Sequence, residues 1–153
     1  MKLEIREMTR ADLEVALGWA RDEGWKPGRD DAAPFRAADP SGFLMGWLGT
    51  VRVGCISVVK YGDSFAFLGL YIVHPAHRGK GYGKRIWDAG IASAAGRTIG
   101  LDGVPAQQDN YRKSGFELAH RSARWGGTLR GLVATRSYVR PVTADDFAAV
   151  AAF

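Results

Sequence analysis

The spacing of apolar and polar positions changes several times along the chain, and each change marks a new element. A period of two predicts a strand and a period of about 3.6 a helix, while glycine, proline and aspartate mark the turns between them. In chain order, this predicts a strand over Lys2–Glu7, helices from Thr9 to about Asp22 and over Asp30–Ala38, strands over Phe43–Leu48, Val51–Tyr61 and Phe65–Val73, a helix after Gly81, a strand over Arg97–Gly103, a helix over Ala106–Ser114, and a hairpin of Phe116–Trp125 with Leu132–Val139. The order indicates an α/β domain with a mixed sheet and helices on both faces.

The first helix carries a complete start signal. Thr9 is the expected N-cap, and Asp12 is the carboxylate that closes a capping box. Met8 before the cap and Leu13 after it can pack together as a hydrophobic staple. The helix is expected to end at Glu23-Gly24-Trp25-Lys26-Pro27-Gly28, where two glycines and a proline forbid regular structure.

Composition describes one ordinary globular domain. The chain has 153 residues, of which 46% are hydrophobic and 24% charged, and its formal net charge is +5. The basic residues are scattered, which argues against a nucleic-acid partner. The single cysteine, Cys55, excludes an internal disulfide and lies in an apolar strand pattern, so we expect a small core residue and a reducing compartment. No apolar run reaches membrane-spanning length and the N-terminus lacks a signal region, so we expect a soluble, cytoplasmic protein without a membrane partner.

The segment after Phe65–Val73 has the features of an anion site. His74 and Pro75 end the strand, and a basic, glycine-rich loop then leads into a helix, in the order Arg78-Gly79-Lys80-Gly81-Tyr82-Gly83-Lys84-Arg85. Glycine lets backbone N–H groups turn toward a ligand, and the helix N-terminus adds partial positive charge. The spacing fits neither a Walker A loop nor the dinucleotide pattern G-x-G-x-x-G. A basic surface loop is the plainer alternative.

Two stretches give a resemblance to one family. The pattern Arg-x-x-Gly-x-Gly over Arg78–Gly83, after a strand that ends Val-x-Pro, resembles the acetyl-CoA-binding motif of the general N-acetyltransferase (GNAT) superfamily. Residues Tyr111–Phe116 resemble the Tyr-x-x-x-Gly-Phe signature on the last helix of these domains. The element order over Lys2–Val139 is also that of the GNAT fold, whose sheet is mixed and mostly antiparallel. The resemblance implies an acetyl-CoA-dependent N-acetyltransferase.

The resemblance also implies which residues act. The backbone of Tyr71, Ile72 and Val73 would pair with the pantetheine arm, and one of their N–H groups would polarise the thioester carbonyl. Arg78 opens the cofactor motif, and the pyrophosphate would be held by Gly79, Lys80, Gly81, Tyr82, Gly83 and Lys84. Tyr111 would protonate the departing thiolate, with a packing tyrosine at a helix end as the alternative. The reaction would be a direct attack on the thioester by a primary amine of a small molecule.

The general base stays open, because the chain departs from the family pattern. Many members carry a glutamate on the central strand or the next one, but Ser64–Val73 contains no carboxylate. Asp102, near the end of the following strand, is the nearest substitute, and Glu23 is a second candidate. The alternative for Asp102 is a turn aspartate that precedes glycine.

A second departure concerns the segment that often supplies a CoA-contacting asparagine. This segment is short here, and three residues could replace that asparagine, namely Gln107, Gln108 and Asn110. The three histidines, His74, His77 and His120, follow no metal-ligand spacing. We therefore expect loop or surface histidines and no metal site.

The N-terminal start signal returns at the end of the chain. Residues 139–147 repeat residues 5–13 position for position, with Thr143 as N-cap and Asp146 as the carboxylate of the box. Such punctuation also recurs by chance, so an unrelated helix start is the alternative. The repeat resembles the tandem acetyltransferases of bacteria, which have two such domains.

This interpretation fixes the predicted boundaries. Residues 1–138 form the GNAT acetyltransferase domain, and residues 139–153 form a linker and the start of a second, truncated repeat. A helix of this length is marginal alone in water. We expect it to pack on a neighbouring copy, as a homodimer, or to stay unfolded.

Two other classes of function remain open. A non-catalytic acyl-CoA-binding regulatory module would carry the same cofactor motif, and the missing strand carboxylate favours it. A nucleic-acid-binding domain is favoured only by the net charge, and the chain lacks aromatic residues interleaved on a basic face. Release of CoA thiol with a panel of amines separates the enzyme from the module.

Overall fold

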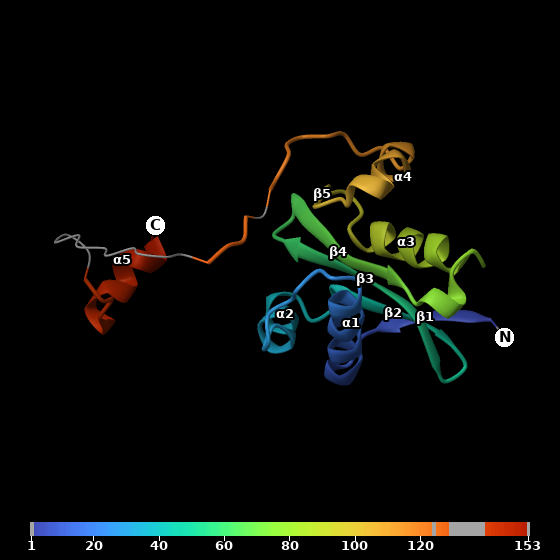
Figure 1. Cartoon of the computed structure of the whole chain (residues 1–153), viewed down its shortest axis with the longest axis horizontal. Coiled ribbons are helices and arrows are strands. Elements are labelled where there is room, and N and C mark those ends of the chain that lie inside the picture. Colours follow the sequence, from blue (N-terminus) through green and yellow to red (C-terminus); the bar gives the residue numbers. More distant parts are fainter. Residues whose placement is uncertain (1, 124, 129–139, 153) are drawn as a thin grey trace. The chain divides into compact units, whose positions relative to one another are not determined.

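The computed structural model describes residues 2–123, 125–128 and 140–152, and the chain divides into two compact units, Met1–Phe116 and Glu117–Phe153. The first unit contains β1 (Leu3–Glu7), α1 (Arg10–Asp22), α2 (Ala32–Ala38), β2 (Phe43–Leu48), β3 (Val51–Tyr61), β4 (Phe65–Val73), the short 3-10 helix η1 (Pro75–His77), α3 (Tyr82–Ser93), β5 (Thr98–Leu101), the 3-10 helix η2 (Pro105–Gln107) and α4 (Gln108–Lys113) (Figure 1). Every element predicted before Phe116 is present, although β5 and α4 are shorter than expected.

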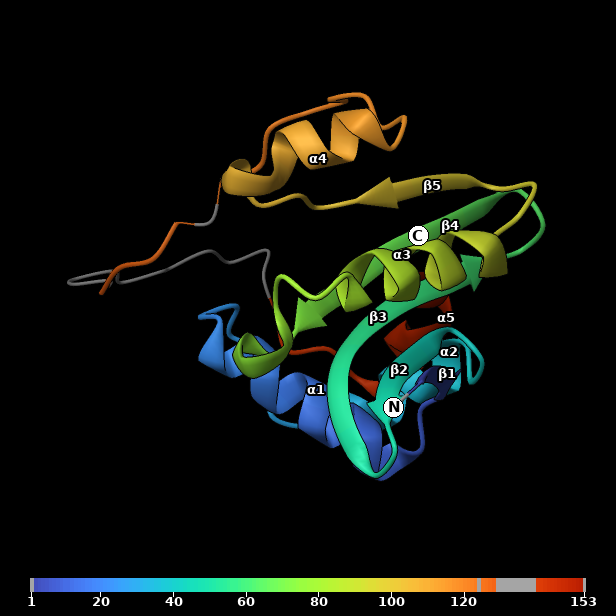
Figure 2. The same ribbon diagram turned by 90° about the vertical axis from the view of Figure 1, so that its right-hand side faces the viewer.

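The strands form a five-stranded sheet in the order β1-β2-β3-β4-β5. All neighbours are antiparallel except β4 and β5, which are parallel. Figure 2 shows β5 running beside β4 in the same direction, with the crossover helix α3 in front of β3 and β4. The predicted mixed, mostly antiparallel sheet is confirmed.

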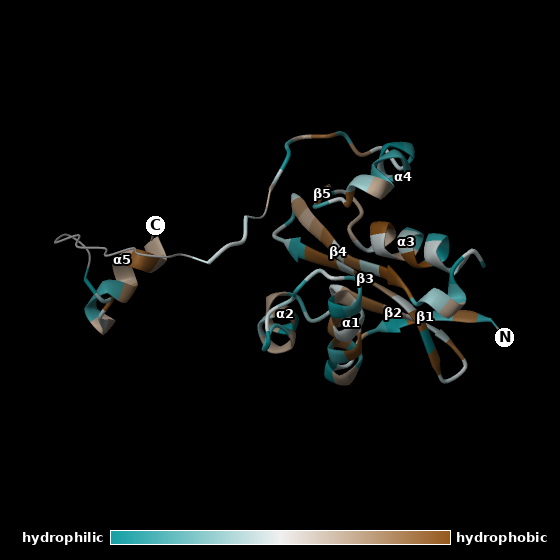
Figure 3. Ribbon diagram, viewed as in Figure 1, coloured by the Kyte–Doolittle hydropathy of each residue, from teal (hydrophilic) through white to brown (hydrophobic). Residues whose placement is uncertain are grey.

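Helices cover both faces of this sheet, with α1 and α2 on one face and α3 on the other (Figure 1). The strands are the most hydrophobic part of the unit (Figure 3), and their side chains feed two buried clusters. The cluster beneath α1 consists of Met8, Leu13, Ala16, Leu17, Ala20, Ala32, Phe43, Met45, Cys55 and Ile72. The cluster beneath α3 consists of Leu3, Val53, Ile56, Val58, Ala66, Leu68, Ile86, Trp87 and Ala94. Cys55 is a core residue, as predicted.

The predicted capping box at the start of α1 is present. The Thr9 N–H and hydroxyl both donate to Asp12 Oδ2, at 2.9 and 2.7 Å, and the Asp12 N–H donates back to the threonine hydroxyl at 3.2 Å. From β3, Arg52 donates to the other oxygen of the Asp12 carboxylate at 2.7 Å. Burial raises the pKa of Asp12, but the hydrogen bonds from Thr9 and Arg52 outweigh it, so the pKa is lowered. Asp12 therefore ties the start of α1 to the sheet as a buried, ionised carboxylate.

The second unit contains η3 (Ala144–Asp146) and α5 (Phe147–Ala152) in its described part. The predicted strand over Phe116–Trp125 is wrong, because none of its described residues lies in a strand. A strand persists only where its apolar face is buried, and here Leu118 is 52% and Trp125 is 92% exposed. The other half of the predicted hairpin, Leu132–Val139, falls outside the described residues.

The predicted second capping box is confirmed. The Thr143 N–H donates to Asp146 Oδ2 at 2.8 Å, and the reciprocal bond of the box is present. The apolar positions around this box are nevertheless exposed, with Phe147 at 64% and Val150 at 62%. In the first copy, the matching Leu13 and Ala16 are 1% and 0% exposed. The two copies share local structure but not burial.

Replacing Asp12 by alanine should lower the free energy of unfolding by about 2 kcal/mol at neutral pH, because an N-cap interaction and a partner of Arg52 are lost together. The pKa of Asp12 is lower in the folded state, so its stabilisation is present above the unfolded pKa of about 4 and is lost as the pH falls through the folded value. The difference between the two proteins should therefore shrink below pH ~4. Urea unfolding followed by circular dichroism measures both effects.

The matched control is Asp146→Ala, which breaks the same kind of box where no apolar face is buried. It should change the unfolding of the first unit by less than about 0.5 kcal/mol. A loss as large as that of Asp12→Ala would contradict this account of the N-terminal cap.

Candidate active site

The middle of the sheet has an open edge along β4. This strand pairs with β3 along its length except at Leu70 and Tyr71, but with β5 only over Phe65–Leu68. Beyond Leu68 and its partner Leu101 the two parallel strands no longer pair, so the last five residues of β4 have a strand on one side only. An unpaired strand edge presents N–H and C=O groups that can bond an extended ligand.

A β-bulge lies where this edge begins. The register with β3 shifts between Cys55 and Ser57, because β4 holds one extra residue there, and Leu70 has φ 45°. The bulge reverses which side chains face which helix. Before it, Ala66 and Leu68 lie in the cluster beneath α3, whereas after it Ile72 lies in the cluster beneath α1. Tyr71 is thereby directed toward α3.

The bulge also decides which backbone groups face the open edge. The His74 N–H donates to Val53 O on β3 at 3.0 Å, and Ile72 is the register partner of Cys55 on the same strand. Since N–H groups alternate between the two edges of a strand, those of Tyr71 and Val73 point away from β3. The Val73 carbonyl on that side accepts a hydrogen bond from Arg78 Nε at 2.8 Å. Two N–H groups are thus directed into the gap between β4 and β5.

The loop before α3 forms a backbone cradle. Gly79 and Gly81 have φ of 72° and 79°, and a Cβ placed on either would meet no atom within 4 Å. Gly81 is the N-cap of α3 and offers no side-chain cap, so the N–H groups of the first helical turn are free of intrahelical partners. With the helix dipole, they form a site for a negatively charged group. The open space and the donor set both fit a diphosphate.

Gly83 sets how closely α3 approaches β4. A Cβ on Gly83 would lie 2.8 Å from Tyr71 Oη and 3.0 Å from Val73 Cγ2. Only glycine therefore lets the first turn of α3 rest on the side chains at the end of β4. This contact brings the cradle next to the open strand edge.

The basic side chains of the loop are used in different ways. The Arg78 guanidinium is taken up within the protein, because it bonds the Val73 carbonyl and forms an ion pair with Glu23. Lys84 forms an ion pair with Asp88 one turn along α3, at 2.5 Å. Lys80 Nζ donates to a backbone carbonyl, that of Ala76, at 2.8 Å, and has no acidic partner in the described part of the chain. Of Arg78, Lys80 and Lys84, Lys80 is therefore the residue whose charge is best available to a phosphate.

Tyr111 lies in an aromatic cluster centred on Trp87 of α3. The Trp87 ring is 5.1 Å from that of Tyr71 and stacks on that of Tyr111 at 5.9 Å. Phe116 packs against both Trp87 and Tyr111. Burial raises the pKa of Tyr111, although a hydrogen bond with the Val104 backbone lowers it in part. Tyr111 is a neutral hydroxyl over the whole physiological range, held next to the residues that line the β4 edge.

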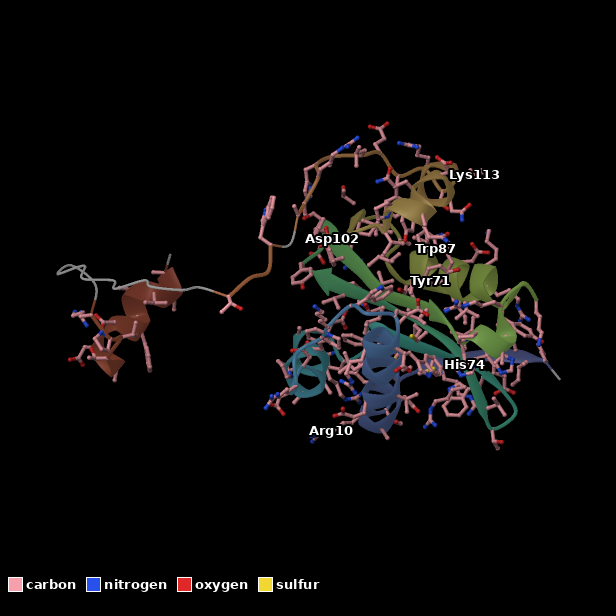
Figure 4. The ribbon with its side chains drawn as sticks, viewed as in Figure 1. Arg10, Tyr71, His74, Trp87, Asp102 and Lys113 are labelled. Atoms are coloured by element: carbon pink, nitrogen blue, oxygen red, sulfur yellow. The ribbon has the colours of Figure 1, made fainter. Side chains whose placement is uncertain are left out.

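Asp102 lies between two residues that pack near Tyr111, because Leu101 belongs to the same apolar cluster and a Cβ on Gly103 would lie 2.6 Å from the Tyr111 ring. Asp102 follows β5, is exposed, and makes no hydrogen bond or ion pair with other described residues. Figure 4 shows it well separated from His74, which marks the end of β4. By contrast, the second candidate base, Glu23, is tied through Arg78 to the Val73 carbonyl at that end. The Arg78 guanidinium bridges the loop after α1 to the last residue of β4, and no sequence signal indicated that link.

The three candidate replacements for the family asparagine lie at η2 and the start of α4. Asn110 donates to the Gln107 side chain at 2.7 Å, so these two amides are engaged with each other. Gln108 is the first residue of α4. Nothing in this arrangement selects one of the three.

His74 and His77 lie in the segment that follows β4, and the His74 ring is partly buried there. The ring of His74 packs at 5.7 Å from Trp19 and 5.8 Å from His77, and its Nδ1 is buried without a partner in the described structure. His120 is exposed. Within the described residues, no group of His, Cys, Asp and Glu is arranged to hold a metal ion.

No helix in the described part of the chain is long and apolar enough to cross a membrane.

Comparison with known proteins identifies the family to which the chain is similar. The sequence profile of the acetyltransferase (GNAT) family matches residues 4–116. A holothin acyltransferase from Pseudoalteromonas sp. (strain SANK 73390) is 37% identical over 142 residues, which cover 93% of this chain and 48% of that protein. An uncharacterized protein of Caenorhabditis elegans is 44% identical over 62 residues, covering 40% of this chain and 20% of its own. The chain thus spans half or less of the length of these relatives.

Solved structures show the same fold at low sequence identity. Ard1 from Thermoplasma volcanium aligns with a TM-score of 0.69 and 20% identity, over 78% of this chain and 86% of that one. N-acetylglutamate synthase from Neisseria gonorrhoeae, in complex with coenzyme A and L-arginine, aligns with a TM-score of 0.62 and 17% identity, over 77% of this chain and 28% of that one.

Proposed function

The chain belongs to the acetyltransferase (GNAT) family and is an acyltransferase, and from this premise we propose that it transfers the acetyl group of acetyl-CoA to a primary amine of a small molecule by direct attack. The observation that carries the proposal is the open edge of β4 beside the cradle at the start of α3. An extended arm that bears amides fits the edge, and a diphosphate fits the cradle.

Acetyl-CoA would supply an acetyl group activated as a thioester. The N–H groups of the first turn of α3 and of the loop Gly79–Gly81 would bind its diphosphate, and Lys80 would add a formal charge. The backbone of Tyr71–Val73 would bind the pantetheine arm as an added strand. Either the Tyr71 or the Val73 N–H would donate to the carbonyl oxygen at the reacting carbon.

Protons would be handled by side chains at the two sides of this edge. The neutral Tyr111 hydroxyl can donate a proton to a thiolate leaving group. Asp102 and Glu23 are the two carboxylates proposed to take the proton of the amine. Glu23 is linked to the end of β4 by the Arg78 guanidinium, while Asp102 is exposed and makes no ion pair with other described residues.

The test has two stages. First, isothermal titration should show that the chain binds CoA. Second, acetyl-CoA should release free thiol when a panel of primary amines is added, and holothin belongs in that panel because the Pseudoalteromonas relative is named for its acylation. Binding without thiol release would favour the regulatory module, and no binding of CoA would overturn the proposed function.

We also propose the cytoplasm as the compartment of this reaction, because a chain with a single cysteine suits a reducing environment.

We also propose that residues 1–138 form the acetyltransferase domain and that residues 139–153 begin a second copy of its β1–α1 start. The shared capping box and the exposed Val142, Phe147 and Val150 support this proposal. So does the length of the Pseudoalteromonas relative, of which this chain covers 48%.

Removal of residues 141–153 should leave the affinity for CoA unchanged, because no residue proposed for the cofactor site lies there. It should abolish self-association of the full chain, measured by analytical ultracentrifugation, since three exposed apolar side chains would be lost. If the shortened chain unfolds, the segment belongs to the first domain and the proposed repeat is wrong.

A further inference from the structure

The β4 bulge is contacted by one buried side chain from the neighbouring strand. Cys55 lies on β3 opposite Ile72, and its Sγ donates to the Leu70 carbonyl at 3.0 Å. Burial raises the pKa of the Cys55 thiol to about 12, although a hydrogen bond from the Ile72 backbone lowers it in part. The thiol therefore keeps its proton. It donates to the carbonyl of Leu70 and accepts from the N–H of Ile72, the two residues that flank Tyr71.

The bulge has little other support from β3. Neither Leu70 nor Tyr71 has a register partner on that strand, so the ladder is interrupted where the extra residue sits. Leu70 also adopts φ 45°, a conformation that costs a non-glycine residue energy and persists only where the surroundings enforce it. The thiol of Cys55 supplies a hydrogen-bond donor at this point, inside a core where an unmatched carbonyl is costly.

The position of the extra residue matters for the open edge. Because the strand alternates, one residue more or less would turn the Tyr71 and Val73 N–H groups toward β3. It would also direct Tyr71 away from Trp87 and from the start of α3. The bulge and the ligand-facing edge are therefore one structural feature.

We propose that Cys55 is a positioning residue of the acyl-CoA site, whose thiol holds the β4 bulge so that the Tyr71 and Val73 N–H groups face the bound pantetheine arm. The inference rests on the proposed function, because it assigns the open edge to that arm. Cys55 does not touch the ligand in this proposal, since its side chain is fully buried on the β3 side of β4.

Two substitutions separate this role from simple packing. Cys55→Ser keeps a donor and an acceptor at the bulge but reduces the apolar volume, whereas Cys55→Val fills the volume and removes both hydrogen bonds. If the thiol positions the bulge, Cys55→Ser should keep the affinity for CoA and Cys55→Val should lose it. If Cys55 only packs, affinity should fall more in the variant with the lower melting temperature. That variant should be Cys55→Ser, because burial of a serine is less favourable than burial of a valine.

The experiment measures CoA binding by isothermal titration, and melting temperature, for the full chain and both variants. We expect Cys55→Val to raise the dissociation constant about fivefold to tenfold, the size of one lost hydrogen bond, and Cys55→Ser to stay within about twofold of the wild type. Equal affinity of wild type and Cys55→Val would overturn the inference while leaving the proposed function standing. Absence of CoA binding by the wild type would instead remove the proposed function and the inference with it.

A measurement on the wild type keeps the test independent of how the variants fold. The chain has one cysteine, so its infrared spectrum contains one S–H stretching band. A thiol that donates to a carbonyl absorbs at lower frequency than a free thiol. A band at the free-thiol frequency would contradict the hydrogen bond to Leu70 and the positioning role.

Discussion

Replacing Tyr111 by phenylalanine should lower the turnover number about 100-fold, the usual scale for loss of a general acid. The affinity for CoA should stay within about twofold, because the phenylalanine ring keeps the packing of Tyr111 on Trp87 and Phe116. Steady-state kinetics with acetyl-CoA and an accepted amine gives the turnover number, and titration with CoA gives the affinity. The expected result is a loss confined to the chemical step.

The pH dependence gives this prediction a second readout. Burial raises the pKa of Tyr111 above its ordinary value of about 10, so the folded enzyme keeps this proton until the pH exceeds that value. A fall in turnover that reflects loss of the proton should therefore begin only above pH ~10 in the wild type and be absent in the phenylalanine variant. Tyr61→Phe is the matched control, because Tyr61 is 55% exposed at the end of β3 and should leave the kinetics unchanged. Equal turnover of wild type and Tyr111→Phe would reduce Tyr111 to a packing residue.

The fold was predictable because its signals are local. The capping boxes at Thr9 and Thr143 are read from residues three positions apart, and both are present. The order of strands and helices follows from changes in apolar spacing, which each element carries in its own residues. Cys55 was placed in the core from the same pattern, and it is fully buried.

The bulge that shapes the candidate site was not predicted. Phe65–Val73 is an unbroken apolar run, so it has no alternation from which a change of face could be read. The one local signal is Gly69, since an isolated glycine inside a strand often marks a bulge. The hydrogen bond that supports the bulge comes from Cys55, on another strand, and no pattern within β4 indicates it.

Long-range contacts also changed the interpretation of charge. The sequence places Arg78 at the start of the cofactor motif, but its guanidinium bonds Glu23, which lies 55 residues away in the chain. The predicted strand over Phe116–Trp125 failed for a related reason. A strand depends on partners and on a buried face that lie elsewhere in the chain, and local propensity does not supply them.

Replacing Gly81 by aspartate should weaken CoA binding at least tenfold while the chain stays folded. Gly81 is the N-cap of α3 and has open space where a side chain would begin, so the new carboxylate would lie at the cradle. There it would repel a diphosphate and occupy the N–H groups of the first helical turn. An asparagine has nearly the same shape as an aspartate but carries no charge. The difference in CoA affinity between Gly81→Asp and Gly81→Asn therefore measures the electrostatic part of the loss.

Backbone strain has to be separated from this effect, because Gly81 has φ 79° and any side chain there is strained. Gly62→Asp is the matched control. Gly62 has φ 60°, has no atom within 4 Å of a new Cβ, and lies in the turn before β4, at the other end of that strand from the cradle. Urea unfolding should show that both aspartate variants are folded, but only Gly81→Asp should lose CoA affinity by titration. If the two variants bind CoA equally well, the diphosphate does not lie at the start of α3, and the acyl-CoA site must be sought elsewhere along β4.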